Sequence, residues 1–361
     1  MRGVSGLRYN VVLAGSHTRD SCHGTLHSLS INMSSKPRTL VRHDPHAVFA
    51  LDDARAYAVW REQKLDDYPR TAQQLVVEIR DPRQLSRAEY QQILRVCGKT
   101  NMAIYACRQA ATMDKDALRR FGEQFGLRRL DGNLCADEDS ISSLRVMAEG
   151  RRQEYIPYTD KPLNWHTDGY YNTPEQRIRA FIIHCAASAD SGGGNALLDY
   201  EIAYIQLRDA NPDFIDALQA VDALTIPPNI EAGVAIRQEQ SGPVFSLDPQ
   251  GLGLHMRYTI RKRHIQWRQD AMTLAAVAHL EDLLNGAAAS PYIFSHRLEA
   301  GQGILCNNVL HNRAGFTDDA QTGRQRLMFR ARYYDRIACG PWLENAAPQT
   351  PMKDPSTVYT P

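Results

Sequence analysis

Residues 179–200, RAFIIHCAASADSGGGNALLDY, contain two apolar runs on either side of a glycine-rich turn. Short apolar runs that are bounded by turn residues are typical of β-strands, so residues 179–187 and 195–200 are each expected to form one. The glycine triplet Gly192–Gly194 is not followed by Lys and Ser or Thr, as a phosphate-binding loop would be, and is better interpreted as a turn. The segment therefore predicts two strands joined by a turn.

The same pattern of short apolar runs continues through the second half of the chain. These runs are QEYIPYT (153–159), GPVFSL (242–247), LHMRYT (254–259), GILCNNVLH (303–311) and RLMFRARYYD (326–335). Two inserted segments, 203–220 and 269–286, have the periodicity of amphipathic helices. Several strands with inserted helices favour a mainly β fold with flanking helices, the double-stranded β-helix or cupin-like jelly-roll barrel, over a parallel βαβ fold.

The first half of the chain alternates between strands and helices. Residues 73–82 and 101–107 are predicted to be strands. A helix over 85–98 is expected to begin at Ser86 and to end at Gly98, and a second helix is expected over 114–126.

The domain organisation predicted from these patterns is simple. We expect a single catalytic domain over residues 36–345, with its core at about 150–336, because there is no internal repeat and no interior linker. Residues 1–35 lack a clear periodic pattern and are expected to be a flexible leader, with an alternative natural start at Met33. The proline-rich residues 346–361 are expected to be a flexible tail.

Composition and charge exclude several classes of protein. The 42 basic and 41 acidic residues give a formal charge of +1, and the chain has no basic run of the kind that follows a phosphate backbone, which argues against nucleic acid as a partner. Seven scattered cysteines without a C-x-x-C motif argue against a disulfide framework and a structural zinc site, and predict a cytoplasmic protein. The chain has no apolar run long enough for a membrane helix, and the sequence leaves a homo-oligomer open.

A histidine and an aspartate stand two residues apart in PLNWHTDGYYN (162–172). Side chains at i and i+2 of an extended segment project from one face, so His166 and Asp168 could hold a metal ion between them. An isolated H-x-D motif is more often a hydrogen-bonded pair at a strand end, so the interpretation depends on a third ligand. On the same parity argument, Asn164 and Tyr170 are candidates for lining a substrate pocket, or equally for bracing the barrel rim.

His311 is the candidate third ligand, because it ends an apolar run that would deliver its imidazole to the mouth of a barrel. Of the other histidines, four are interpreted as surface residues (His43, His46, His264, His279) and two as core or pocket residues (His184, His255). Four arginines of the following strand share one parity and would need an anion: Arg324, Arg326, Arg330 and Arg332. Two histidines and one carboxylate describe the facial triad of non-haem Fe(II) oxygenases.

Four motifs, in order, resemble the taurine dioxygenase (TauD/TfdA-like) family of Fe(II)/2-oxoglutarate-dependent oxygenases. They are NWHTDGYYN (164–172), SGGGNALLDYEIAY (191–204), LEAGQGILCNNVLHNRAGF (298–316) and RQRLMFRARYYD (324–335). The resemblance implies His166, Asp168 and His311 as the iron ligands and catalytic centre. It implies that Arg326 binds the distal carboxylate of 2-oxoglutarate and that Arg330 faces a carboxylate or sulfonate of a small substrate.

The chain departs from the family pattern at two places. The family commonly has Gly-Gly-Asp-Thr where this chain has Gly193-Gly194-Asn195-Ala196, and alanine cannot supply the hydroxyl that helps to hold 2-oxoglutarate. Asn195 is therefore the candidate replacement. An Asp-Asn pair commonly precedes the last histidine, where this chain has Asn307-Asn308.

The activity that the resemblance implies is oxidation of a substrate C–H bond with O₂ and 2-oxoglutarate, releasing succinate and CO₂. Hydroxylation is favoured over halogenation because halogenating relatives lack the carboxylate of Asp168. Desaturation or cyclisation in secondary metabolism, a non-catalytic metal-binding jelly roll and a zinc hydrolase are the alternatives. Residues 227–240 are expected to be part of a lid.

Overall fold

A computed structural model describes residues 43–108, 113–132, 137–231, 233–248, 251, 253–261, 265–286 and 290–340. The predicted leader, the predicted tail and His264 lie outside these residues. The described residues all belong to one compact unit.

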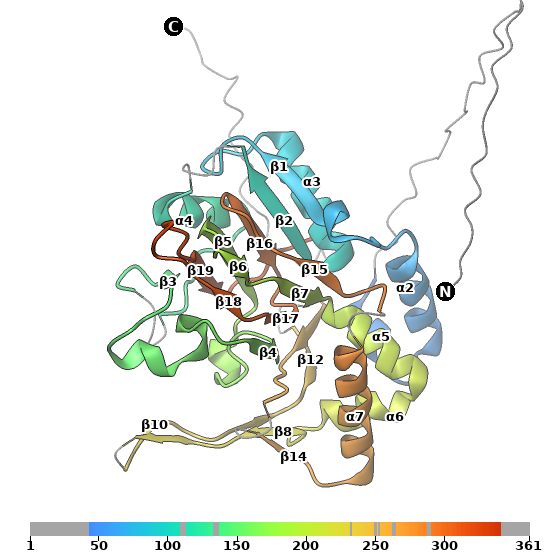
Figure 1. The fold of residues 1–361 in the computed structure, drawn as a ribbon. Coiled ribbons are helices and arrows are strands. Elements are labelled where there is room, and N and C mark those ends of the chain that lie inside the picture. Colours follow the sequence, from blue (N-terminus) through green and yellow to red (C-terminus); the bar gives the residue numbers. More distant parts are fainter. Residues whose placement is uncertain are drawn as a thin grey trace, which may run out of the picture. The chain divides into compact units, whose positions relative to one another are not determined.

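A six-stranded sheet forms the larger half of the fold (Figure 1). In spatial order its strands are β1 (Val76–Ile79), β2 (Met102–Cys107), β16 (Gln302–Cys306), β5 (Ala180–Ala187), β19 (Leu327–Tyr333) and β3 (Ser142–Leu144). β1 and β2 are parallel and the remaining pairs are antiparallel. The runs at 101–107, 179–187 and 326–335 are therefore strands, as predicted.

A four-stranded sheet faces the larger one. Its order is β15 (Phe294–His296), β7 (Asn195–Leu198), β17 (Leu310–Arg313) and β4 (Leu163–His166), and every pair is antiparallel. The two sheets line one cavity, because Phe181 and Ile304 of the large sheet and Leu197 of the small sheet are among its walls. Two facing sheets connected in this way form the predicted jelly roll.

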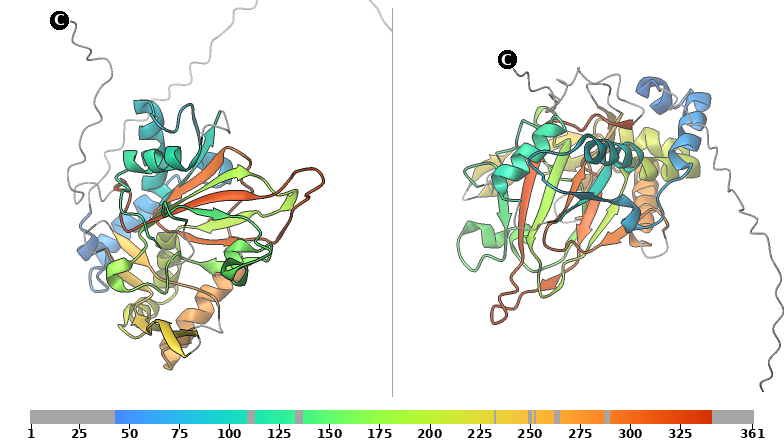
Figure 2. Two further views of the ribbon diagram at one scale, coloured as in Figure 1. Left: turned by 90° about the vertical axis from the view of Figure 1, so that its left-hand side faces the viewer. Right: turned by 90° about the horizontal axis from the view of Figure 1, so that it is seen from above.

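Helices flank the two sheets. α3 (Arg87–Thr100) and α4 (Lys115–Gln124) contact strands of the large sheet, and Figure 2 shows them lying across its strands. The other helices are α1 (Pro45–Phe49), α2 (Ala54–Leu65), α5 (Tyr200–Ala210), α6 (Pro212–Gln219) and α7 (Ala271–Asn285). Among the described helices, none combines the length and the apolar character that crossing a bilayer requires.

Shorter elements complete the fold. The small sheets pair β6 (Ser191–Gly192) with β18 (Phe316–Thr317), β9 (Asn229–Glu231) with β10 (Val234–Arg237), β12 (Phe245–Leu247) with β13 (Leu254–Met256), and β8 (Leu224–Ile226) with β11 (Gln240–Gly242) and β14 (Gln266–Trp267). Single 3₁₀ turns span Ala72–Leu75, Arg151–Glu154, Ile156–Tyr158 and Pro174–Gln176.

The end of α3 differs from the sequence expectation. The helix starts at the predicted Ser86 cap but continues past Gly98 to Thr100, where Asn101 takes the left-handed conformation with φ 56°. Gly98 instead lies against Gly340, and a Cβ atom at residue 98 would stand 2.8 Å from the Gly340 Cα atom. The glycine is thus needed for close packing and not for a turn.

Three other expectations were wrong in detail. The helix expected over 203–220 is divided into α5 and α6, because Pro212 starts a new helix that Asn211 caps. The run 153–159 forms 3₁₀ turns around Pro157 and not a strand. The run 303–311 forms two strands, β16 and β17, since Asn308 between them has φ 54° and turns the chain from one sheet to the other.

Candidate metal centre and its cavity

Strand pairing brings the two candidate histidines together. His166 is the last residue of β4, and His311 of β17 is its direct partner in the antiparallel ladder. Their ring centroids are 4.2 Å apart. Asp168 follows in a turn at Gly169, whose φ of 66° suits glycine. One donor atom from each of the three side chains lies within 4.8 Å of the other two, and no second such cluster occurs in the described part of the chain.

Backbone carbonyls select the tautomer of both imidazoles. The Nδ1 atom of His166 is 2.8 Å from the Asn164 carbonyl oxygen, and that of His311 is 3.0 Å from the Val309 carbonyl oxygen. A carbonyl only accepts, so each Nδ1 carries the hydrogen and each Nε2 keeps a lone pair for a metal. Burial, together with the neighbouring His166, lowers the pKa of His311 to about 3, which keeps it in the neutral form that binds metals.

Asp168 supplies a buried carboxylate to the same point. Burial opposes its ionisation, but the positive charge of Arg330 holds the pKa of Asp168 well below its usual range. Its Oδ2 atom is buried and has no hydrogen-bond partner among the described residues. A buried, charged oxygen without a partner is costly unless a ligand binds it. Together with two free Nε2 atoms, it fits a metal ion that has open coordination positions.

Asn308 holds the backbone of Asp168 in place. Its Oδ1 atom accepts a hydrogen bond of 2.8 Å from the Asp168 N–H, and its Nδ2 atom donates to the carbonyls of Asp168 and Ile178. In sequence, Asn308 stands out only as a departure from a family pattern, and the pattern does not predict this contact. The available signal was an asparagine, which tolerates φ > 0, immediately before the strand of His311.

A cavity between the two sheets adjoins His311 and contains Arg326 and Arg330. Its walls are formed by Leu144, Pro157, Leu163, Phe181, Ile183, Asn195, Leu197, Ile304, His311, Arg313, Arg326 and Arg330. The lining is therefore apolar and aromatic apart from one imidazole, one amide and three guanidinium groups. That composition suits a small anionic ligand with a carbon skeleton.

The two arginines predicted to bind anions occupy different places in this cavity. Arg330 lies beside the ligands, with Nη1 3.5 Å from Asp168 Oδ1, and its Nε has no hydrogen-bond partner in the described chain. Arg326 lies beside Phe316, with its Cζ atom 5.0 Å from the ring centroid. Its buried Nη1 atom also lacks a partner among the described residues, and burial lowers the pKa of Arg326 to about 10. Both groups can still accept an anion.

The other two arginines of the predicted row do not reach the cavity. Arg324 precedes β19, and its largely exposed side chain forms an ion pair with Asp190 at 3.2 Å. Arg332 is buried but pairs with Asp131 and donates to the Tyr171 hydroxyl at 3.1 Å. Alternation along the strand could not predict that Asp131 forms an ion pair with Arg332. It also could not predict that Arg324 lies before the first residue of β19.

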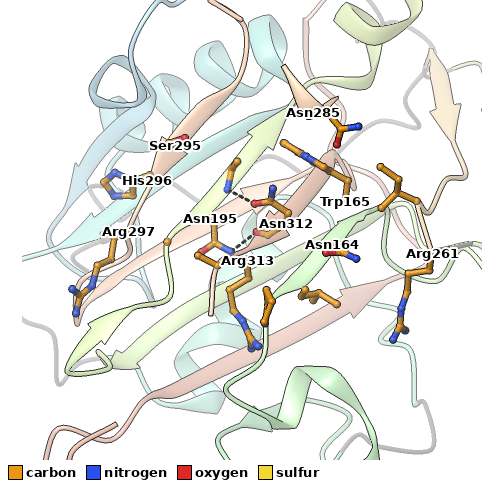
Figure 3. A pocket seen from close by; sticks show the side chains of 16 residues that line it. Asn164, Trp165, Asn195, Arg261, Asn285, Ser295, His296, Arg297, Asn312 and Arg313 are labelled. Atoms are coloured by element: carbon orange, nitrogen blue, oxygen red, sulfur yellow. Dashed lines mark hydrogen bonds between the residues drawn. The ribbon is translucent and has the colours of Figure 1, made fainter. Parts of the chain in front are cut away.

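Asn164 is separated from the metal centre, contrary to the parity argument. His311 pairs with His166 and Arg313 with Leu163, so β4 has one extra residue between the two pairs. This bulge places Leu163, and not Asn164, in the cavity with His311. Asn164 is exposed and lines a groove of about 1050 Å³ over the small sheet, which shares Leu163, Asn195 and Arg313 with the cavity (Figure 3).

The remaining candidates lie near the centre. Asn195 lines the cavity together with Arg326, and its Nδ2 atom donates to the Asn312 carbonyl at 3.0 Å (Figure 3). Tyr170 lies on the other side of Asp168, where both line a small pocket. The described part of 227–240 forms the β9–β10 hairpin, and Arg237 near its end lies over the Tyr171 ring at 5.5 Å. Its role as a lid stays a prediction.

Two histidines and one carboxylate that meet beside the cavity of a jelly roll are typical of non-haem metal proteins, and this fold and site place the chain in that class. The profile described as "Taurine catabolism dioxygenase TauD, TfdA family" matches residues 66–332, and the chain belongs to this family. The family resemblance seen in the four sequence motifs is thus confirmed.

Two curated relatives are similar to the chain in sequence, and a solved structure is similar to it in fold. The chain is 30% identical over 172 residues to a uridine-5'-phosphate dioxygenase from an Amycolatopsis species, covering 47% of this chain and 60% of the relative. It is 27% identical over 205 residues to one from a Streptomyces species, covering 55% of this chain and 71% of that protein. The non-haem iron oxygenase OrfP in complex with Fe and alpha-ketoglutaric acid has a similar fold, with a TM-score of 0.50 and 14% identity over 80% of this chain and 90% of OrfP. The jelly-roll prediction is confirmed.

Proposed function

We propose that the protein is an Fe(II)- and 2-oxoglutarate-dependent dioxygenase that oxidises a C–H bond of a small anionic molecule. The observation that carries the proposal is the position of the unpartnered Asp168 Oδ2 atom, beside two Nε2 lone pairs and next to the cavity that contains Arg326. Family membership supports it. When bound, the iron supplies the activation of O₂ that couples conversion of 2-oxoglutarate to succinate and CO₂ with oxidation of the substrate.

The residues of this chain have separate tasks in that reaction. His166, Asp168 and His311 would hold the metal, and a set of three protein ligands would leave coordination positions open for cosubstrate and O₂. Arg326 provides a planar pair of donors that matches a carboxylate, and its unpartnered Nη1 suits the distal carboxylate of 2-oxoglutarate. The apolar walls formed by Phe181, Leu197 and Ile304 exclude water from the rest of the cosubstrate. Asn195 lies close enough to contribute a polar contact to it.

Arg330 directs the choice of substrate. It is the arginine nearest the metal ligands, and its free Nε atom can bind an anionic group close to the carbon that reacts. A carboxylate, a sulfonate or a phosphate would satisfy this requirement. Two relatives carry the name uridine-5'-phosphate dioxygenase, which favours a phosphate monoester of the nucleotide type as the first class to test.

The test is anaerobic addition of Fe(II) and 2-oxoglutarate to the purified protein, followed by measurement of the weak visible charge-transfer band. We expect a saturable band that is absent in His311→Ala. Release of succinate on admission of O₂ is then screened with nucleoside monophosphates, amino acids, sulfonates and carboxylates. No band in the wild-type protein would contradict the proposal and favour the zinc hydrolase. A band without substrate-stimulated succinate release from any class would favour a non-catalytic metal-binding module.

A further inference from the structure

A third arginine, Arg313, lines the cavity that contains Arg326. It is the last residue of β17, two positions after His311, so both side chains project from the same face of that strand. Its partner on the neighbouring strand is Asn195, and Figure 3 shows the two residues on adjacent strands. Arg313 is buried, with 5% of its surface exposed. None of the sequence motifs identified it as a candidate.

Arg313 and Arg326 approach the same aromatic ring. The Cζ atom of Arg313 is 4.9 Å from the Phe316 ring centroid, and that of Arg326 is 5.0 Å from it. Both buried cations therefore lie close to the Phe316 ring. Arg313 uses Nη2 to donate to the carbonyls of Thr159 and Lys161, which leaves the rest of its guanidinium available. Its buried Nε atom has no hydrogen-bond partner within the described residues.

The cavity does not contain the negative charge that these cations require. Among the described residues, its lining includes no aspartate or glutamate. Asp160 and Asp318 act on Arg313 and Arg326 from outside this lining, and Asp168 lies beside Arg330. Two buried cations that face a cavity without a carboxylate in its walls are costly, and the cost falls when a shared anion binds both. One anion between Arg313 and Arg326 would satisfy the unpartnered nitrogens of both side chains.

Resting on the proposed function, we propose that Arg313 and Arg326 together bind the distal carboxylate of 2-oxoglutarate. Arg313 is thereby a cosubstrate-binding residue that selects dicarboxylic over monocarboxylic 2-oxo acids. A 2-oxo acid that lacks the distal carboxylate, such as pyruvate, would reach the metal but would leave both arginines unpaired. Such selection follows because a site built around buried polar groups rejects an analogue that leaves them unsatisfied.

The experiment compares Arg313→Gln with wild type and with Arg261→Gln. Arg261 is a matched control, because it lines the large groove together with Arg313 but does not line the cavity. Glutamine at residue 313 keeps one donor for the Thr159 carbonyl and removes the charge. The dissociation constants of 2-oxoglutarate and of pyruvate are measured by anaerobic titration of the Fe(II)-loaded proteins. We expect Arg313→Gln to weaken 2-oxoglutarate at least tenfold and to leave pyruvate within twofold, and Arg261→Gln to change neither.

The outcomes separate this inference from the proposed function. If wild type binds no 2-oxoglutarate in the presence of Fe(II), the proposed function fails. If wild type binds it and Arg313→Gln matches wild type, or weakens both acids equally, Arg313 has only a structural role. If Arg313→Gln does not fold, Arg313→Lys is tested instead. We expect the lysine to keep hydrogen bonds to the Thr159 and Lys161 carbonyls. We also expect it to weaken the affinity for 2-oxoglutarate at least threefold relative to that for pyruvate, because an ammonium group cannot contact these carbonyls and a carboxylate at once as a planar guanidinium group can. Unchanged affinity in Arg313→Lys would overturn the inference.

Discussion

His166 and His311 face each other across an antiparallel pair of strands, and their ring centroids are 4.2 Å apart. The two residues are far apart in the chain, yet each has its Nδ1 atom held by a backbone carbonyl of its own segment. The pair is therefore preset for metal binding by local hydrogen bonds and brought together by strand pairing. Asp168 completes the group from the turn that follows β4.

The three ligands should control metal content. We expect wild type to bind one Fe(II) per chain, and His166→Ala and His311→Ala to lose most of it, because one imidazole and one carboxylate cannot hold the ion as firmly as three ligands. Metal analysis after anaerobic loading and desalting measures the effect. His296→Ala is the control, since His296 lies on β15 and bonds to Gln302 at 3.0 Å. Full iron content in both ligand variants would exclude the site.

Asn308 should matter although it does not touch the metal. Removing its side chain in Asn308→Ala deletes three hydrogen bonds that fix the Asp168 and Ile178 backbone. Loss of groups that orient a ligand commonly costs about 10–100-fold in metal affinity, and we expect that range here. Competition with a colorimetric chelator measures the affinity. A melting temperature close to wild type combined with unchanged metal affinity would show that Asp168 needs no such support.

Arg326 and Arg330 should bind different ligands, although Arg330 lies in β19 and Arg326 immediately precedes that strand. Truncating one partner of a buried charge pair costs about 3–5 kcal/mol, so Arg326→Ala should weaken 2-oxoglutarate by two decades or more. Arg326→Lys should recover little, because lysine cannot form the bidentate contact. Arg330→Ala should bind 2-oxoglutarate normally and should raise the Michaelis constant of the primary substrate, most strongly for anionic substrates.

Anaerobic titration of 2-oxoglutarate into each Fe(II)-loaded variant distinguishes the two roles. The assignment is reversed if Arg330→Ala loses the cosubstrate while Arg326→Ala keeps it. Arg324→Ala serves as the control for removal of an arginine from this segment, because the exposed ion pair of Arg324 with Asp190 lies outside the cavity. We expect its affinity for 2-oxoglutarate to equal that of wild type.

His184 should make the fold sensitive to acid. Burial in β5 lowers the pKa of His184 to about 4, and its Nδ1 atom lies 3.2 Å from the Tyr105 hydroxyl. Between an ordinary pKa near 6.5 and this value, the unfolded chain binds a proton at His184 and the folded chain does not, so the free energy of unfolding falls as the pH falls. At 1.36 kcal/mol for each pKa unit, the contribution is about 3 kcal/mol across that window.

Chemical denaturation of wild type and His184→Gln at pH 7.5 and pH 4.5 checks this expectation. The variant should lose less stability than wild type on acidification, because glutamine does not titrate. Above pH 6.5 the difference between the two proteins should be constant. A parallel decline in both proteins would show that other groups cause the acid sensitivity.

Local sequence patterns predicted much of the fold. Ser86 and Glu89 form a reciprocal cap at the start of α3, and such a cap depends only on neighbouring residues. The strands at β2, β5 and β19 likewise follow from their own apolar character. The end of α3 could not be predicted in this way, because Gly98 is required by its contact with Gly340 at the other end of the domain.

The sequence by itself determined which residue types could bind a metal and an anion: two histidines and an aspartate in strand-like segments, and arginines spaced four apart. Tertiary structure alone decided which of them share a cavity. The bulge in β4 places Leu163, and not Asn164, in the wall of the cavity. Asp131 neutralises Arg332. The turn at Asn308 leads the chain into β17, whose Arg313 lines the same cavity as Arg326. Each outcome depends on the register between segments distant in sequence, and because side chains alternate along a strand, a shift of one residue reverses the face that a side chain occupies.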